Sequence, residues 1–261
     1  MSAVRPTAAT QALPALARYA LALGDDALIL SHRCAEWIAH APELEEDVAL
    51  ANIGLDLLGQ ARMLLTYAGE VEGAGRDEDD LAYLREERDV LNLQICERPN
   101  DDFAVSTARL LLFSLYARGL FAQLSASRDE RLAAIAAKSL KEVAYHVDHA
   151  SAWVVRLGDG TAESHARMRA GLEQMWPYVD EMFDGSWIDP ALLADGVAVD
   201  VAGLRPEWDA DVERVLAEAT LERPTASFTA TGGRQGVHTE ALGYLLAEMQ
   251  HLHRSHPGAT W

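Results

Sequence analysis

Glu142 and His146, in the stretch KEVAYHVDHA (residues 141–150), have residue types and spacing close to those of a metal site. Di-iron proteins built on four-helix bundles use Glu-x-x-His on two helices and a single Glu on each of the other two. Here the histidine follows the glutamate by four residues instead of three. His149 lies three residues further on and could share the same helix face. This stretch therefore resembles at most half of a di-iron site.

The second half of such a site is not found on the helix expected at 42–70. Asp56 is followed three residues later by Gly59, where a Glu-x-x-His motif would need a histidine. Asn52, Asp56 and Gln60 are spaced four residues apart and form a narrow polar stripe on an otherwise apolar helix. Such a stripe is typical of a buried hydrogen-bond network.

The expected helix hairpins place further charged residues at the same height as these groups. If the first hairpin turns near residue 41 and the second near residue 127, Asp26 lies opposite Asp56, and Arg109 is level with His146. An arginine guanidinium stays protonated, so it repels a metal cation and binds carboxylates directly. The sequence therefore favours salt bridges over a metal at this level.

We accordingly predict no catalytic residue and no metal ligand in this chain, and a buried polar network in place of a metal centre. The members of this predicted network are Arg33, Asn52, Asp56, Gln60, Arg109, Glu142 and His146. One alternative stays open, in which the chain is a self-sufficient di-iron oxygenase with the atypical ligands Asp56, Glu142 and His146. Whether the chain is an enzyme in its own right is therefore undecided from the residues.

A glycine-rich stretch, TATGGRQGVHTE (residues 229–240), is a second candidate site. Gly232, Gly233, Arg234 and Gly236 lie just before an expected helix start, where free backbone N–H groups can hold an anion. The stretch lacks the Gly-Lys-Ser/Thr ending of a P-loop. A flexible connector is the simpler interpretation, and contact with an anion is the alternative.

The elements that would position these residues are all helical. Ala, Leu, Glu and Arg dominate, runs of β-branched residues are scarce, and helical periodicity recurs along the chain. We predict a flexible tail at 1–12 and one ferritin-like domain at 13–261, with the bundle at 13–157 and a C-terminal helical layer at 158–261. The helices are expected at 14–40, 42–70, 102–126, 127–157, 163–183, 201–221 and 238–255, with a further short helix that ends near 90. A bend is expected at Gly24, and a capping box from Ser127 to Glu130 is expected to begin the helix that ends at 157. A minor extended segment is expected at 195–200.

Composition narrows the function classes. The net charge of −19 argues against nucleic-acid binding, which needs clustered Lys and Arg. The chain has no apolar run of about 18 residues and no export signal, so a cytoplasmic protein without a membrane span is expected. Cys34 and Cys96 have neither metal-ligand nor disulfide spacing and are expected in the core. The helix at 42–70 is apolar around nearly its whole circumference, which predicts a place in the centre of the bundle or at a subunit interface.

Three longer strings carry a family resemblance. SHRCAEWIAHAPELEEDVALANIGLDLLGQAR (31–62), IAAKSLKEVAYH (135–146) and GVHTEALGYLLAEMQHLHRSHPGATW (236–261) resemble the C subunits of ring-1,2-phenylacetyl-CoA epoxidases, which are multicomponent monooxygenases of aerobic phenylacetate degradation. The resemblance extends over most of the chain from about Leu13.

The resemblance implies a ferritin-like structural subunit without its own di-iron centre. It implies a homologous catalytic A subunit that carries the di-iron site, and a reductase component that delivers electrons from NADPH through flavin and iron–sulfur groups. No cofactor is expected in this chain itself. A homodimer in isolation and a regulatory subunit that binds the CoA ester stay open as alternatives.

Overall fold

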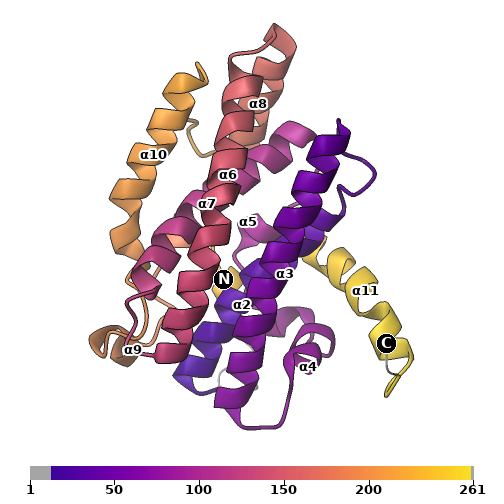
Figure 1. Ribbon diagram of the computed structural model, residues 1–261, viewed down its shortest axis with the longest axis vertical. Helices are drawn as coiled ribbons and strands as arrows, with labels where there is room; N and C mark the ends of the chain where they lie inside the picture. The colour runs from indigo at the N-terminus through magenta and orange to yellow at the C-terminus, as the bar shows by residue number, and fades with distance from the viewer. Residues whose placement is uncertain (1–12, 260–261) are drawn as a thin grey trace.

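The computed structural model describes residues 13–259, and all regular structure in that range is helical (Figure 1). The tail predicted at 1–12 lies outside the described residues. Four long helices form the bundle: α2 (Ala15–Ala35), α3 (Leu44–Glu72), α6 (Phe103–Leu124) and α7 (Glu130–Gly158). Helix α2 packs along α3, α6 packs along α7, and α3 faces α7. The all-α four-helix bundle predicted from the sequence is confirmed.

The ends of these helices follow local capping chemistry. Asp102 begins α6 by accepting a hydrogen bond from the Val105 N–H at 2.9 Å. Asp129 does the same for α7, accepting from the Leu132 N–H at 2.8 Å. The capping box predicted at Ser127 is therefore wrong, because the Ser127 hydroxyl instead donates to the Val197 carbonyl. An oxygen acceptor at this N-cap position is typically worth ~1 kcal/mol.

The first helix also ends earlier than expected, at Ala35, and residues 36–43 form turns. The bend expected at Gly24 is not a break, because α2 continues through it. A Cβ atom at Gly24 would lie 2.9 Å from Leu65 Cδ2 of α3. The missing side chain therefore allows a close crossing of α2 and α3. Along α3, fully buried residues such as Ile53 and Leu64 each contribute about 1.5–3 kcal/mol through burial.

A segment of the connection between the two helix pairs enters the bundle. This connection contains α4 (Glu78–Tyr83), the 3₁₀ turn η1 (Glu87–Asp89) and α5 (Gln94–Glu97). Residues 90–97 are all buried, and α5 packs against both α2 and α6. We call residues 90–97 the inserted segment. The inserted segment therefore occupies part of the bundle interior between α2 and α6.

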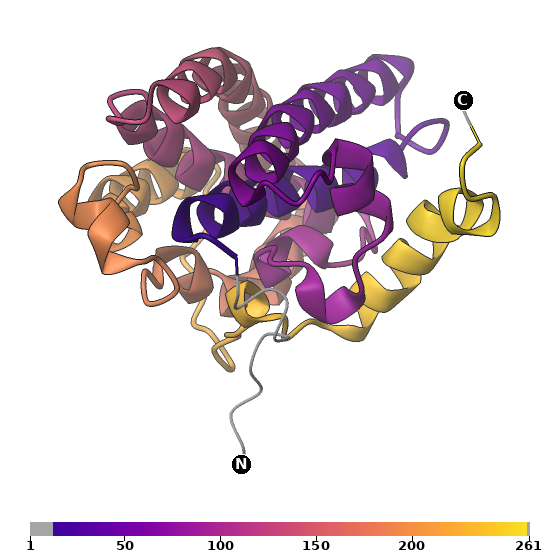
Figure 2. The ribbon, with the colours of Figure 1, turned by 90° about the horizontal axis from the view of Figure 1, so that it is seen from below.

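The remaining helices, in the range predicted for the C-terminal helical layer (158–261), lie on more than one side of the bundle. They are α8 (Ala162–Met175), η2 (Trp176–Tyr178), η3 (Asp180–Phe183), α9 (Pro190–Ala194), η4 (Val201–Leu204), α10 (Arg205–Glu218), η5 (Gly233–Gln235) and α11 (Glu240–Ser255). Helices α8 and α10 pack on α6 and α7, whereas α11 contacts α4 and α5 on another side (Figures 1 and 2). The segment expected to be extended at 195–200 has turns and bends at 195–198 and no regular structure at 199–200, and the described residues contain no strand.

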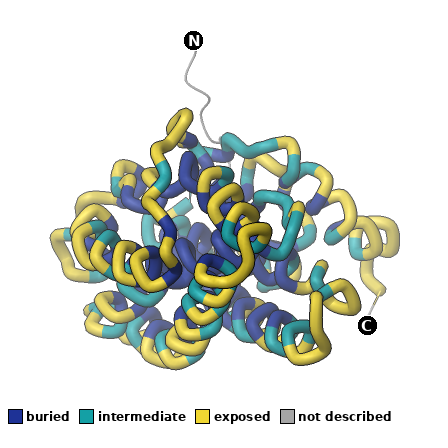
Figure 3. The backbone as a smooth tube through the Cα atoms, turned by 90° about the horizontal axis from the view of Figure 1, so that it is seen from above, coloured by how far each residue is buried: buried dark blue, intermediate teal, exposed yellow. Residues whose placement is uncertain are grey.

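Helix α3 keeps one apolar face uncovered. Leu44, Val48, Leu55 and Leu58 are exposed by 75, 53, 64 and 38%. Exposed positions run along the outer sides of the long helices (Figure 3). Of the two positions predicted for this helix, the fully enclosed one is therefore wrong. Within 13–259, α3 is also the one helix long and apolar enough to cross a membrane, although 44% of its apolar window is buried in the bundle.

Candidate functional site

Adjacent aspartates on α2 hold the inserted segment through its backbone. The Leu91 N–H donates to the Asp25 carboxylate at 2.8 Å, and the Leu93 N–H donates to Asp26 at 2.7 Å. Asp25 forms an ion pair with Arg85, and both side chains are almost fully buried. The Asp25 and Asp26 carboxylates therefore accept hydrogen bonds from the backbone of the inserted segment, and Asp25 is also paired with Arg85.

Asp26 is neutralised by Arg234, from the glycine-rich stretch near the end of the chain. The Arg234 Nη2 lies 2.6 Å from the Asp26 carboxylate, and Nη1 also donates to the carbonyls of Ala22 and Leu91. Burial raises the pKa of Asp26 to about 6, an effect that Arg234 opposes. Burial alone would lower the pKa of Arg234, but Asp26 more than offsets it and the pKa lies above its ordinary value. Both groups are therefore charged at neutral pH.

The glycine-rich stretch, for which anion contact at Gly232, Gly233, Arg234 and Gly236 was the alternative to a flexible connector, packs against the interior. The Arg234 side chain is only 2% exposed and its charge is satisfied inside the core. A Cβ atom at Gly233 would lie 2.3 Å from the Asn92 carbonyl oxygen, and one at Gly236 would lie 2.2 Å from that of Arg88. Gly233 and Gly236 therefore permit close packing of this turn against the inserted segment and against the residues just before it.

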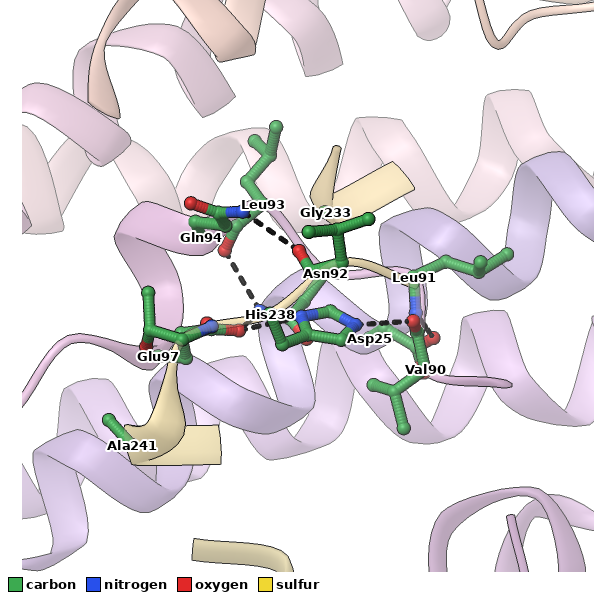
Figure 4. Close-up of polar contacts among 12 residues, drawn as sticks. Asp25, Val90, Leu91, Asn92, Leu93, Gln94, Glu97, Gly233, His238 and Ala241 are labelled. Carbon is green, nitrogen blue, oxygen red and sulfur yellow. Dashed lines mark hydrogen bonds and ion pairs between the residues drawn. The ribbon is translucent and has the colours of Figure 1, made fainter. Parts of the chain in front are cut away.

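A buried histidine and glutamate complete this region (Figure 4). His238 Nδ1 lies 2.8 Å from the Glu97 carboxylate, and Nε2 lies 2.8 Å from the Val90 carbonyl oxygen. Since both partners can only accept, both ring nitrogens carry hydrogen and the ring is cationic. Burial lowers the pKa of His238, but the contacts to Glu97 and Val90 outweigh burial and raise it above the usual value.

Glu181, from η3, is the last carboxylate of this cluster. It accepts hydrogen bonds from the N–H groups of Gln94 and Gly233, each at 2.7 Å. Burial raises the pKa of Glu181, while these backbone donors lower it. We call Asp25, Asp26, Arg85, Glu97, Glu181, Arg234 and His238 the core ion cluster. Of these, only Asp26 and Arg234 were singled out from the sequence, and each was given a different role.

The polar residues predicted on α3 and α7 do meet, as two separate pairs. Gln60 Nε2 donates to the Glu142 carboxylate at 3.0 Å, and His146 Nε2 lies 3.1 Å from Asp56. Burial lowers the pKa of His146, although Asp56 raises it, so the ring is neutral near pH 7 and donates through Nε2. Asn52 faces solvent and takes no part. We call these two contacts the α3–α7 pairs.

Arg33 and Arg109 are buried but do not join the α3–α7 pairs, so their predicted place in that network is wrong. Arg33 donates to the Glu97 carbonyl at 2.8 Å and forms an ion pair with Glu36. Arg109 donates to the Arg98 carbonyl and to the Asn100 side chain. Burial lowers the pKa of Arg109 to about 10. Both arginines tie the loop before α6 to the bundle.

The interior of the bundle lacks the arrangement of ligands that a di-iron centre needs in the part of the chain that the structure describes. Among the described residues, no three His, Cys, Asp or Glu side chains come close enough together to hold a metal ion. Asp26, which occupies the expected height on α2, binds Arg234. His149, the extra candidate on α7, pairs with Glu46 at 3.3 Å. Cys34 and Cys96 are buried, as predicted, and are not bonded to each other. The residues present therefore do not fit a di-iron site.

Comparisons with known proteins identify relatives. A family model described as phenylacetic acid catabolic protein matches residues 1–261. The chain is 49% identical over 246 residues to the C subunit of 1,2-phenylacetyl-CoA epoxidase from Escherichia coli, covering 94% of this chain and 99% of that protein. The resemblance and ferritin-like fold predicted from the sequence are thus confirmed. Its sequence and its helical bundle place this chain in the phenylacetic acid catabolic protein family.

Proposed function

We propose that this chain is the non-catalytic, structural subunit of a cytoplasmic oxygenase that epoxidises the aromatic ring of phenylacetyl-CoA. In this proposal a homologous catalytic subunit carries the di-iron centre, and a reductase component supplies electrons from NADPH through flavin and iron–sulfur groups. The observation that carries the proposal is the Asp26–Arg234 ion pair, which takes up the α2 carboxylate that a metal would need. The chain's role is then to support its partner.

The uncovered face of α3 supports a partner of helical shape. Its apolar residues Leu44, Val48, Ala51, Leu55 and Leu58 are separated alternately by four and three residues. This is the spacing of the a and d positions of a coiled coil, which bury their side chains against another helix. We call these five residues the α3 seam.

We assign the α3 seam to a helix of the homologous catalytic subunit. The related protein is itself named as one subunit of an epoxidase, so other chains accompany it. Glu45 and Asp47 flank the seam, which favours a partner helix with Lys or Arg at its edges. Pairing with a second copy would oppose acidic flanks and two net charges of −19.

The seam can be tested with Leu55→Asp. Leu55 is 64% exposed, so the isolated chain should keep its thermal unfolding midpoint. Co-expression with the catalytic subunit followed by size-exclusion chromatography should show loss of the complex. Leu84→Asp is the matched control, since Leu84 is 50% exposed and lies after α4, off the seam. A wild-type complex yield with Leu55→Asp would contradict the assignment, and so would dimers of the isolated chain that this change disrupts.

The same preparations test the absence of metal chemistry in this chain. After anaerobic loading with ferrous iron and desalting, the isolated chain should hold far less than one iron, and the complex should hold iron through its partner. Epoxidase activity should appear only in the complex with the reductase. Two tightly retained irons per isolated chain would overturn the proposed function.

A further inference from the structure

A cavity at the beginning of α2 borders the core ion cluster, because the Arg234 guanidinium lies over the ring of Trp187, a wall residue, at 4.6 Å from the ring centroid. Its volume is about 330 Å³, and it lies between the first turns of α2 and residues 186–190. This is within the size range of small-molecule sites, which start near 300 Å³. The walls include the apolar side chains of Leu13 and Ile188 and the aromatic rings of Tyr19 and Trp187.

One positive charge lines this cavity. Arg18 is partly buried, and its guanidinium donates to the carbonyls of Trp187 at 2.8 Å and Arg234 at 2.9 Å. These bonds fix the group but use only two of its five N–H donors. Its Nε has no hydrogen-bond partner among the described residues.

Arg18 has no negative partner to balance its charge. Its hydrogen bonds within 13–259 go to backbone carbonyls, and the one charged neighbour that shifts its pKa is Arg234, although the sequence holds 41 acidic residues against 22 Lys and Arg. Asp189 also lines the cavity, but its carboxylate caps α9 by accepting from the Ala191 N–H. Residues 1–12 contain neither Asp nor Glu, so their side chains offer no counter-charge either.

The helix end adds a second source of positive potential. Helix α2 has no side-chain cap and no acidic residue in its first turn. The free N–H groups and dipole of such an end favour an anion. Burial and then the neighbouring Arg234 lower the pKa of Arg18, as expected for a cation without a counter-ion.

We propose that this cavity binds a small carboxylate with an apolar or aromatic body. The carboxylate would meet the remaining Nη N–H donors of Arg18 at the start of α2, since Nε is buried. The apolar body would lie against Ile188 and the rings of Tyr19 and Trp187, which stack on each other with centroids 5.6 Å apart. This site is independent of the α3 seam and of the proposed structural role.

The test uses the full chain and benzoate as the probe, with benzamide as its neutral counterpart, in isothermal titration calorimetry. Benzoate should bind, and benzamide should bind about tenfold more weakly or not at all, because a charge-assisted contact is lost. Arg18→Gln should weaken benzoate binding by a similar factor while keeping an amide donor for one of the two carbonyls.

Ala15→Phe is a second variant that fills the cavity without touching the charge. Ala15 is the first residue of α2 and lines the cavity, and Ala162, the first residue of α8, provides the matched control Ala162→Phe. Benzoate binding should disappear in Ala15→Phe and persist in Ala162→Phe, with thermal melts showing that both are folded. No binding by the wild-type chain, or equal binding by Ala15→Phe and wild type, would overturn the proposal.

Discussion

The core ion cluster and the α3–α7 pairs occupy two halves of one bundle, yet they differ in how completely their charges are enclosed. Asp26 and Arg234 have side chains exposed by 4 and 2%, and each makes several hydrogen bonds. Across the bundle, the Asp56 side chain is 36% exposed and has one partner, His146. The first region excludes water from its charges, and the second leaves a carboxylate in contact with it.

This difference shows two ways of occupying a bundle interior that related folds use for metal. In the α2 half, carboxylates accept bonds from the backbone of the inserted segment and from arginines, so they act as structural anchors. In the α3–α7 half, neutral His146 and Gln60 each hold one carboxylate. Removing a partner should therefore be costly in the first half and tolerated in the second.

The largest expected effect comes from removing one member of the core ion cluster. Asp26→Ala leaves the Arg234 guanidinium buried without its carboxylate and the Leu93 N–H without an acceptor. The free energy of unfolding should fall by about 3–5 kcal/mol in urea denaturation. Asp56→Ala, its counterpart on α3, should cost about 1 kcal/mol or less because that carboxylate is partly solvated.

A double variant tests whether the loss in Asp26→Ala comes from the unpaired charge. The double replacement of Asp26 by Leu and Arg234 by Met should recover most of the lost stability, because apolar groups of similar size leave no charge unpaired. Equal losses for Asp26→Ala and Asp56→Ala would show that the two halves are equally solvated.

The next largest effect is on the pH dependence of the free energy of unfolding, which should have opposite signs for His238 and His146. The pKa of His238 is raised in the folded state, where the ring faces Glu97, the Val90 carbonyl and the more distant Glu87. Its stabilisation is complete below the unfolded value of about 6.5 and is lost as pH rises through the raised folded pKa. The pKa of His146 is lowered, mainly by burial, so its region loses stability as pH falls through about 6.5.

Unfolding free energies measured from pH 5 to 9 separate these contributions. His238→Gln should flatten the alkaline side of the profile, by about 1–3 kcal/mol for a buried charged hydrogen bond. His146→Gln should flatten only the acidic side. A variant of His238 that leaves the alkaline side unchanged would show that the ring is neutral in the folded protein.

The smallest expected losses of stability come from replacing one glutamine in each half. Gln60→Ala should cost about 0.5–1.5 kcal/mol, since Glu142 can be hydrated when its 3.0 Å bond is lost. Gln94→Ala should cost more, because the Val237 carbonyl, bonded at 2.8 Å, would be left without a donor near the core. Thermal unfolding of both variants ranks them, and a reversed order would contradict the proposed difference in enclosure.

Much of the α3–α7 half could be predicted from the sequence. Helical periodicity located both helices, and the spacing of Asp56, Gln60, Glu142 and His146 placed them on facing sides, where they form two pairs. Counting residues from a helix turn predicts height along the bundle. It does not predict direction around the helix axis, which is why Arg33 and Arg109 were assigned to the wrong contacts.

The core ion cluster could not be predicted in the same way, because its cations come from outside the four long helices. Arg85 follows α4, Arg234 lies within the glycine-rich turn η5, and His238 follows that turn. The available signal was Asp25 beside Asp26 within the apolar run ALALGDDALIL, since two adjacent carboxylates in a core helix require buried cations. The apolar residues of 90–97 indicate burial, as predicted for Cys96, but not that this segment lies between α2 and α6.

The pairing of Asp26 with Arg234 joins residues 208 positions apart, and this separation has a consequence for biosynthesis. A ribosome completes all four bundle helices long before it adds Arg234 and His238. Until then, Asp26 and Glu97 have no cation, and closing the interior around them would leave charges buried and unpaired. We therefore expect the native bundle to close only after translation is nearly complete, and a chain that ends before residue 230 to be strongly destabilised.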